Sequence, residues 1–359
     1  MSSTSCLPPR AFHLVSSTSS SLETTLTRAW LRRGPLACAL WPLSLLFRAL
    51  SGLRKLLFRA GVLKSTRLPV PVIVVGNIFI GGTGKTPLTI WLAEALRAAG
   101  LNPGIISRGH GGSDSAPRQV TPDSHAREVG DEPLLIARRT GCPVVVGRDR
   151  GAAGRALLAA HPHIDVILTD DGLQHYALQR DIEIMLFDGR GAGNGWLLPA
   201  GPLREAPSRR RDFTIVNAPD ITPAVRAAVG GKPFRMQLAG EFAEPLLRPG
   251  ERVPLASLRG RRLVAACGIG NPQRFFTLLR GAGLEVIELA LPDHHDFLDQ
   301  PFAAVDADII LITEKDAVKC AQIENLKNDP RLWVVPVTAQ LDGALAQQIV
   351  EKCRGCSTA

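Results

Sequence analysis

Three features are scarce in this chain, and each absence excludes a class of protein. The seven cysteines among 359 residues are odd in number and scattered, which argues for a reducing compartment and against a disulfide framework. Cys353 and Cys356 form a CxxC near the C-terminus, but no second ligand pair accompanies it, so we interpret it as incidental. The apolar run Pro35 to Phe47 has 13 residues, short of the roughly 18 that a helix needs to cross a bilayer. Arginines on both sides of that run, its depth in the chain and the lack of a cleavage site also argue against a signal peptide.

Acidic residues are almost missing from the first 70 positions. These positions hold ten lysines and arginines but a single acid, Glu23, so their formal net charge is +9, which equals that of the whole chain. The remainder is therefore neutral, whereas a nucleic-acid-binding protein more often spreads a basic face over its folded body. We expect no nucleic-acid partner. A basic N-terminal arm fits an anionic membrane surface better.

The second half of this arm has the pattern of an amphipathic helix. Arg48, Lys55 and Arg59 fall mostly on one face, and apolar residues recur at helical spacing on another: Leu46, Ala49, Leu50, Leu53, Leu56, Leu57 and Ala60. Such a helix can lie in the membrane interface with its basic residues among lipid phosphates. The alternative is a helix packed on the protein's own core. The charge asymmetry favours the membrane, because it would serve no purpose in a buried helix.

From Leu68 onwards, short β-branched runs alternate with helical patterns, which predicts a parallel sheet covered on both faces. Strands are expected at 70–75, 104–107, 143–146, 165–169, 182–187 and 213–216, with helices at 85–99, 132–139 and 150–160. A second alternation begins at Arg262, with strands at 263–267, 285–289, 309–313 and 332–335, and helices at 272–280, 316–322 and 341–352. The Pro- and Gly-rich region 219–260 is expected to be the junction.

These patterns predict an α/β protein with a P-loop NTPase-like parallel sheet and a second, smaller α/β domain. The expected divisions are a disordered Ser/Thr-rich extension at 1–28, a basic amphipathic membrane-associated segment at 29–66, a core domain with the P-loop-type sheet at 67–218 and a C-terminal domain at 219–359.

A glycine is also missing from the most informative motif, VGNIFIGGTGKTP at 75–87. A P-loop has glycine, four residues, then Gly-Lys-Ser/Thr; Gly84, Lys85 and Thr86 fit, but Phe79 stands in place of the first glycine. The stretch nevertheless follows a strand and opens a helix, as a phosphate loop does. Its backbone N–H groups, Lys85 and the helix N-terminus can bind phosphate, and Thr86 can bind Mg²⁺. The predicted nucleotide-binding residues are Gly81, Gly82, Thr83, Gly84, Lys85, Thr86 and Pro87.

A second motif, Asp170-Asp171-Gly172, ends the hydrophobic run 166–169. A carboxylate at the tip of a buried strand beside a P-loop is where Mg²⁺ is held in P-loop enzymes. One such turn alone would commonly be solvated. The two motifs together, with two strand–helix units between them, favour a P-loop fold.

Three further groups of residues bear on the reaction. Asp131 and Glu132 open a helix, where an aspartate can also serve simply as a cap. Arg148 and Arg150 follow a strand, at the edge of the sheet where open α/β folds bind ligands, although solvated arginines would look the same. The run 293–296, Asp-His-His-Asp, has the composition of a metal site or of an Asp–His pair.

The motifs together resemble the tetraacyldisaccharide 4'-kinase family of lipid A biosynthesis, over about residues 29–350. The resemblance rests on VGNIFIGGTGKTP, SRGHGG, VGDEP, VVVGRDR, DDGLQH, GNGWLLPAGPLRE, ACGIGNPQRFF, PDHHDF and TEKDAVK, in that order. It implies a P-loop kinase that transfers the ATP γ-phosphate to the 4'-hydroxyl of membrane-embedded tetraacyldisaccharide 1-phosphate to form lipid IVA. The implied cofactors are ATP and Mg²⁺, and no obligatory protein partner is expected. The implied location is the cytoplasmic face of the inner membrane of Gram-negative bacteria.

The resemblance also implies individual roles. Lys85 and Thr86 would hold phosphates and Mg²⁺, and the metal side would comprise Thr86, Glu132, Asp170, Asp171 and Gln174. Asp131 would be the base for the sugar hydroxyl, supported by Asp293 and His294, with His295 the alternative histidine. The lipid headgroup would contact Arg108, Arg148, Arg150, His175 and Arg204. The family's own loop has a hydrophobic residue where Phe79 stands, and we expect Phe79 and Ile80 to make that arm stiff and buried. His110 departs from the tyrosine often found in the family, which leaves an aromatic stacking role there unsupported.

Two other functions remain compatible with parts of the sequence. A membrane-associated ATPase that switches partners would share the GGTGKT end, but it usually carries a lysine where Ile80 stands. A non-enzymatic lipid-binding scaffold would leave DDGLQH and PDHHDF without a role.

Overall fold

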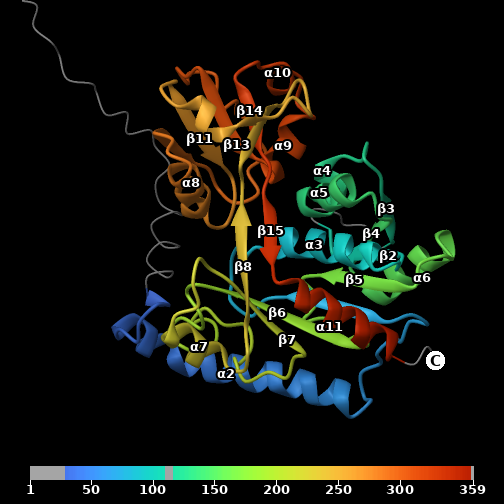
Figure 1. Ribbon diagram of the computed structural model, residues 1–359. Helices are drawn as coiled ribbons and strands as arrows, with labels where there is room; N and C mark the ends of the chain where they lie inside the picture. Colours follow the sequence, from blue (N-terminus) through green and yellow to red (C-terminus); the bar gives the residue numbers. More distant parts are fainter. Residues whose placement is uncertain (1–28, 110–115, 357–359) are drawn as a thin grey trace, which may run out of the picture.

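The chain forms two sheet-centred units, with a long N-terminal helix beside the first of them (Figure 1). The computed structural model describes residues 29–109 and 116–356. The Ser/Thr-rich extension 1–28, which we expected to be disordered, and His110 lie outside the described residues.

The first sheet contains β1 (Val72–Gly76), β2 (Pro103–Ser107), β3 (Arg118–Val120), β4 (Val144–Val146), β5 (Val166–Asp170), β6 (Ile182–Asp188), β7 (Phe213–Asn217), β8 (Phe234–Ala239) and β15 (Thr338–Leu341). Their spatial order is β15-β8-β7-β6-β1-β5-β2-β4-β3. Neighbouring strands from β8 across to β4 are parallel, and the two outer strands, β15 and β3, are antiparallel to their neighbours. The predicted P-loop-type parallel sheet is therefore confirmed.

Helices cover both faces of this sheet, because successive residues of a strand point to opposite sides. All five residues of β1 are buried, as expected for a central parallel strand. One face packs against α3 (Lys85–Ala98), α5 (Asp131–Thr140) and α11 (Gly343–Arg354), and the other against α6 (Arg150–Ala160) and α7 (Pro223–Val229). A short helix, α4 (Ala126–Val129), precedes α5.

The second sheet contains β9 (Phe242–Pro245), β10 (Val253–Pro254), β11 (Leu263–Cys267), β12 (Val286–Ala290), β13 (Ile309–Thr313) and β14 (Leu332–Val335), in the order β10-β9-β14-β13-β11-β12. One face packs against α8 (Pro272–Gly281) and the 3₁₀ helix η1 (Leu255–Leu258). The other packs against α9 (Glu314–Cys320) and α10 (Glu324–Lys327). In Figure 1 this unit is the orange and red part at the top.

The division between the two sheets does not coincide with the boundary expected at residue 219. β8 pairs with β7, and β15, near the C-terminus, pairs with β8 (Figure 1). The first sheet therefore includes strands that precede and follow the second sheet in the sequence. The region expected to be a junction holds α7, β8, β9, β10 and η1. β8, for example, mixes polar with apolar residues along a half-exposed strand, and such a short mixed run gives a weak sequence signal.

The N-terminal segment differs from the sequence expectation in length. The apolar run and the amphipathic stretch form one helix, α2 (Pro35–Arg59), of 25 residues. Of the residues described, this is the one helix long and apolar enough to cross a membrane, judged by length and mean hydropathy (1.6) alone. The 13-residue apolar run alone is too short to cross a bilayer, but in the structure it continues through Arg48 as part of this longer helix, which also accommodates Pro42.

The leucine-rich face of α2 points away from the protein. Leu43, Leu46, Leu50 and Leu53 are each more than half exposed, whereas Ala37 and Ser44 are buried. Contacts to the first unit extend along the helix, from Trp41 against Trp196 to Phe58 against Tyr176. The Ser44 hydroxyl donates to the Leu197 carbonyl (2.8 Å) between these two contacts. The helix thus lies along the surface of the first unit, as its position at the base of Figure 1 shows, with its apolar stripe outward.

The return of the chain to the first sheet predicts that α11 stabilises the first unit. Ile349 is 1% exposed in the core beneath α3, so Ile349→Ala should lower the free energy of unfolding by about 2–4 kcal/mol. Chemical denaturation followed by circular dichroism measures this loss. Gln347→Ala, on the exposed side of the same helix, is the control and should change little. An equal, small effect of both variants would contradict the packing described.

Candidate active site

The loop between β1 and α3 has the backbone that a phosphate loop requires. Gly81 and Gly84 have φ angles of +95° and +100°, in the left-handed region that favours glycine. A Cβ atom at Gly84 would also lie 2.5 Å from the Asn217 side-chain nitrogen, so no larger residue fits there. The Asn217 amide donates to the Thr83 carbonyl (2.9 Å) and so holds the loop to the end of β7.

Phe79, which occupies the place of the missing glycine, anchors this loop in the core. Its side chain is 2% exposed, and the Arg190 guanidinium lies 4.1 Å from the ring centroid. The Asn77 side-chain amide donates to the Phe79 carbonyl (2.7 Å) and to the Thr83 hydroxyl (3.0 Å), which ties the two arms of the loop together. The expectation that this arm is buried at Phe79 is confirmed, and Ile80 is only partly buried.

Lys85 and the acidic end of β5 meet beside this loop. The Lys85 Nζ atom lies 3.8 Å from Asp171 Oδ1 and 3.4 Å from Asn77 Oδ1. Asp170 is 1% exposed and accepts a hydrogen bond from the Thr89 hydroxyl (3.4 Å). The register of the sheet explains this meeting, because Val75 at the end of β1 is paired with Asp170. Both predicted motifs therefore face the same site.

The two aspartates differ in their electrostatic surroundings. Burial and the charge of Glu132 raise the pKa of Asp170, and Lys85 offsets only part of this effect. Burial would also raise the pKa of Asp171, but Lys85, Arg204 and Arg150 outweigh it and hold that pKa below its usual range. A divalent cation bound here would relieve the repulsion between Asp170 and Glu132.

The donor set fits a magnesium–nucleotide complex better than a metal held by protein alone. Over the parts of the chain that the structure describes, no three His, Cys, Asp or Glu side chains are grouped closely enough to hold a metal ion. Mg²⁺ in kinases usually keeps few protein ligands and takes the rest from water and substrate phosphates. The Thr86 hydroxyl and Asp170 on either side of the phosphate loop are oxygen donors of that kind.

The other predicted residues at this edge form a polar network. Arg204 Nη1 lies 3.3 Å from Asp171 Oδ2 and donates to Gln174 Oε1 (3.4 Å), while the Gln174 amide donates to Glu205 (2.9 Å). The side-chain oxygen and nitrogen of Gln174, a predicted metal ligand, are thus both hydrogen-bonded to other side chains.

The two candidate arginines after β4 occupy different places. Arg150 is 4% exposed and donates to the Asp170 carbonyl (3.0 Å), so it supports the acidic edge. Arg148 is exposed at the cleft, as is Arg108. Arg148 and Arg150 both line the cleft, and of the two Arg148 is the one with an exposed side chain.

His175 lies beside this network as a neutral imidazole. Burial, together with the charges of Arg150 and Arg180, lowers the pKa of His175 to about 4. Its Nε2 atom is buried, and in residues 29–109 and 116–356 it has no hydrogen-bond partner.

Asp131 and His294 form the second part of the site. Asp131 is the first residue of α5 and is 4% exposed, and His294 Nδ1 lies 3.0 Å from its Oδ2. Burial would raise the pKa of Asp131, but the hydrogen bond from His294 and the charges of Lys315 and Lys319 hold it well below the usual range. The same hydrogen bond raises the pKa of His294. His295, the alternative, instead accepts a hydrogen bond from the Phe297 amide at its Nδ1.

The sequence analysis missed the cations that complete this part of the site. Lys315 Nζ lies 3.0 Å from Glu132 Oε1, 3.5 Å from Asp293 Oδ1 and 3.4 Å from His294 Nε2. Lys319 Nζ lies 3.6 Å from Asp131 Oδ2. Both lysines are in TEKDAVK, which carried part of the family resemblance but received no role, because α5 and α9 are distant in sequence. Asn217 was missed for the same reason, since its contact with Thr83 is long-range. Asn77 was missed although it lies within the loop motif and its contacts with Phe79 and Thr83 are local.

One open cleft of about 2010 Å³ joins these groups. Every predicted site residue lines it except Asp131, which lies behind His294: the lining includes Gly81, Gly82, Thr83, Gly84, Lys85, Thr86, Pro87, Arg108, Glu132, Arg148, Arg150, Asp170, Asp171, Gln174, His175, Arg204, Asp293 and His294. Residues of the second unit, such as Gly270 and Asn271, reach the phosphate loop at Gly82. The cleft therefore lies between the two units.

Comparisons with known proteins agree with this geometry. The sequence model of the tetraacyldisaccharide-1-P 4'-kinase family matches residues 36–354. A tetraacyldisaccharide 4'-kinase of Herminiimonas arsenicoxydans is 63% identical over 353 residues, covering 95% of this chain and 98% of that protein. Another, from Janthinobacterium sp. (strain Marseille), is 62% identical over 95% of this chain and 99% of its own length. The crystal structure of "apo" form LpxK from Aquifex aeolicus in complex with ATP is similar with a TM-score of 0.72 and 30% identity, and covers 88% of this chain and 99% of that one.

The burial of Phe79 predicts that restoring a small residue there impairs the loop. Phe79→Ala should lower the free energy of unfolding by about 3–5 kcal/mol and weaken ATP binding, since the arm loses its anchor. Thermal unfolding and titration calorimetry with ATP measure the two effects. Ile80→Ala, at the partly exposed neighbour, is the control for the unfolding effect. If Phe79→Gly bound ATP as tightly as the parent, the anchoring role would be refuted.

Proposed function

The chain belongs to the tetraacyldisaccharide-1-P 4'-kinase family. We propose that separate groups of residues in its cleft bind ATP and activate the 4'-hydroxyl of that lipid for phosphorylation. The phosphate loop and the acidic end of β5 bind the nucleotide. The Asp131–His294 pair takes the proton of the acceptor hydroxyl. The observation that carries this proposal is that both groups open into one cleft, with the lysines of α9 beside the pair.

On the nucleotide side, backbone N–H groups of residues 81–84, the N-terminus of α3 and Lys85 hold the polyphosphate. The residues that would hold Mg²⁺ are Thr86, Asp170 and Asp171, with Glu132 nearby. Bound there with ATP, the ion would neutralise charge on the phosphate oxygens. Arg150 and Thr89 keep the acidic edge in place.

On the acceptor side, Asp131 acts through His294. The carboxylate does not line the cleft, whereas the His294 side chain is 34% exposed and does. Hydrogen bonding to Asp131 places the proton on Nδ1, so Nε2 is the atom that accepts the hydroxyl proton, and it must give up its contact with the Lys315 ammonium (3.4 Å) when the hydroxyl binds. As the 4'-oxygen bonds to the γ-phosphorus and ADP leaves, Asp131 stabilises the imidazolium.

The acceptor also carries a phosphate, which needs cationic and neutral donors. Arg108, Arg148, Arg204 and His175 line the cleft beside the acidic edge and are the proposed contacts. Arg150, an alternative from the sequence, instead supports Asp170 from beneath.

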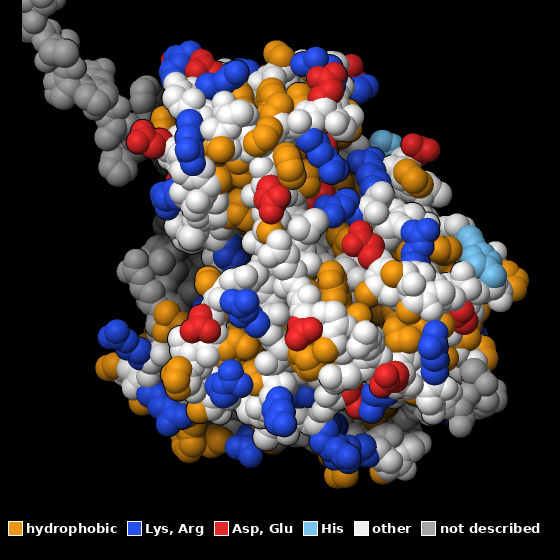
Figure 2. All heavy atoms as spheres, viewed as in Figure 1, with side chains coloured by type: hydrophobic (Ala, Val, Ile, Leu, Met, Phe, Trp, Pro, Cys, Tyr) orange, Lys and Arg blue, Asp and Glu red, His pale blue; other side chains and the backbone are white. Residues whose placement is uncertain are grey.

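The lipid acceptor requires the enzyme to work at a membrane surface, and α2 is suited to this. The outward stripe of Leu43, Leu46, Leu50 and Leu53 would enter the apolar part of the interface. Figure 2 shows blue basic side chains between orange hydrophobic ones along the lower margin, where α2 lies in Figure 1. Contacts along α2 with the first unit favour a helix lying in the surface over one that crosses it. The proposed location is the cytoplasmic face of the bacterial inner membrane, where ATP is available.

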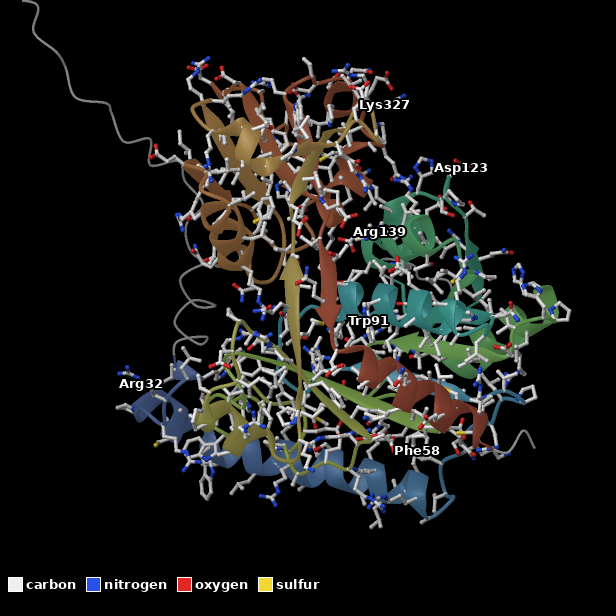
Figure 3. The ribbon with its side chains drawn as sticks, in the orientation of Figure 1. Arg32, Phe58, Trp91, Asp123, Arg139 and Lys327 are labelled. Atoms are coloured by element: carbon white, nitrogen blue, oxygen red, sulfur yellow. The ribbon has the colours of Figure 1, made fainter. Side chains whose placement is uncertain are left out.

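Transfer of labelled γ-phosphate from ATP to the tetraacyldisaccharide 1-phosphate tests the catalytic proposal. Asp131→Ala and His294→Ala should each lower turnover about 100-fold or more with ATP affinity little changed, because proton removal is lost. Lys85→Ala should weaken ATP binding as well. Asp123→Ala, an exposed carboxylate of the first unit labelled in Figure 3, is the control and should behave like the parent.

Each contrary result has a distinct meaning. Label released as free phosphate with none in the lipid would indicate an ATPase, and lipid binding without turnover would indicate a scaffold. Parent kinetics for Asp131→Ala would remove that residue from the base role. Normal turnover for His294→Ala beside an inactive Asp131→Ala would mean that Asp131 meets the hydroxyl directly.

Flotation with anionic lipid vesicles tests the proposed role of α2. Replacing Leu46, Leu50 and Leu53 together by Glu should reduce vesicle binding about 100-fold, since three exposed leucines no longer enter the interface. Substitution is preferable to deletion, because α2 also covers part of the first unit. Ile287→Glu, at a 68% exposed position of the second unit, is the control. Unchanged partitioning of the triple variant would contradict the interfacial helix.

A further inference from the structure

Helices α5 and α9 meet across the boundary between the two units through ion pairs. Arg139 Nη1 lies 2.5 Å from Glu314 Oε1, and Lys315 Nζ lies 3.0 Å from Glu132 Oε1. Figure 3 shows Arg139 at this boundary, directed from α5 towards the second unit. The third pair, Lys319 with Asp131, is the most buried of the three, with side chains 12% and 4% exposed. The proposed catalytic carboxylate thus belongs to the contact that docks the units.

Lys319 is held in place by a second buried carboxylate. Its Nζ atom lies 3.4 Å from Oδ1 of Asp316, one turn earlier in α9, and 5.1 Å from the Phe297 ring centroid. Asp316 is 0% exposed, and its other oxygen accepts hydrogen bonds from the Gly268 amide (3.1 Å) and the Thr313 hydroxyl (2.7 Å). The ammonium is therefore anchored from the second unit while it faces Asp131.

Lys315 is placed differently, although it is also near Asp131. Its nearest carboxylates are those of Glu132 and Asp293, and Asp131 Oδ2 is 3.9 Å away. Burial would lower the pKa of Lys315, but these carboxylates outweigh it and raise that pKa. Lys315 thus pairs with Glu132 and Asp293, which line the cleft, whereas Lys319 lies behind them beside Asp131.

We propose that Lys319 is a positioning residue for phosphoryl transfer, which, anchored by Asp316, holds the Asp131 carboxylate in the orientation that receives the His294 Nδ1–H. The inference rests on the proposed roles of Asp131 and His294. Asp131 comes from the first unit, and His294 and Lys319 come from the second. The proton-accepting pair is therefore aligned only when the units are docked, and Lys319 contributes to that alignment without touching substrate.

Label transfer to the lipid acceptor tests this role. Lys319→Met should lower kcat about tenfold or more and leave KM for ATP within about twofold, because the carboxylate loses orientation while the phosphate loop is untouched. Lys319→Arg, which retains the charge, should recover part of kcat. Lys327→Met is the control: Lys327, labelled in Figure 3, is exposed on α10, pairs with Glu324 at the surface and does not line the cleft. A parent-like kcat for Lys319→Met would overturn the proposal.

A double-mutant cycle with Asp131→Asn separates positioning from general stability. If Lys319 acts through Asp131, Lys319→Met should change the residual rate of Asp131→Asn by no more than about twofold. The same fold-loss in both backgrounds would overturn the proposal and assign Lys319 a structural role. If Asp131→Asn itself were as active as the parent, the catalytic proposal would fail instead, so the two failures are distinguishable.

Removing Lys319 alone leaves Asp316 buried without its cation, which can impair folding. Lys319→Met combined with Asp316→Asn removes both charges and should fold, as thermal unfolding would show, with the same loss of kcat as Lys319→Met. Asp316→Asn alone leaves the ammonium facing Asp131 and should reduce kcat less than Lys319→Met. Full activity of the folded double variant would overturn the proposal.

Discussion

The site depends on keeping two buried carboxylates charged. Asp170 and Asp131 are 1% and 4% exposed, and an ionised carboxylate in such a place is stable only beside cations and hydrogen-bond donors. The two are neutralised in different ways. Asp131 receives its partners, His294 and Lys319, from the second unit. Asp170 has a raised pKa with the residues present, because burial and Glu132 outweigh Lys85. The contact between the units thus supplies cations to Asp131, whereas Asp170 lacks comparable compensation from the described residues.

The N-terminal helix α2 exposes its apolar side chains, whereas the core buries them. An ordinary surface helix buries its apolar stripe and exposes its polar face. In α2 the buried positions include Ser44, and the leucines face outward. The helix is held to the first unit by a serine hydrogen bond and aromatic contacts, which leave the apolar stripe available. Exposing these leucines to water is energetically unfavourable, and the arrangement is understandable if a lipid surface covers them. The helix and the cleft then act together at the lipid surface, because the acceptor is itself a lipid.

The sequence predicted the central strands and the phosphate loop well, since buried parallel strands are continuous apolar runs and the loop is a local motif. β11, β13 and β14 begin and end where the apolar runs do. It missed β8 and β15, whose half-exposed residues mix polar with apolar. It also ended the apolar run of α2 at Phe47, although the exposed Arg48 interrupts such a run without interrupting the helix. The candidate residues of the cleft were found by local motifs. Lys319 was not, since its role depends on a contact with Asp131 that spans 188 positions and only the tertiary structure creates.

The pairing of β15 with β8 has a consequence for the order in which the protein is built. The second sheet draws all its strands from Phe242–Val335, one uninterrupted stretch, whereas the first needs residues 338–341 to complete its edge. During synthesis on the ribosome, the later unit therefore has every strand available before the earlier one does. The first sheet is therefore completed after the second, and a chain that stops at Val337 retains the complete smaller sheet but leaves an open edge at β8.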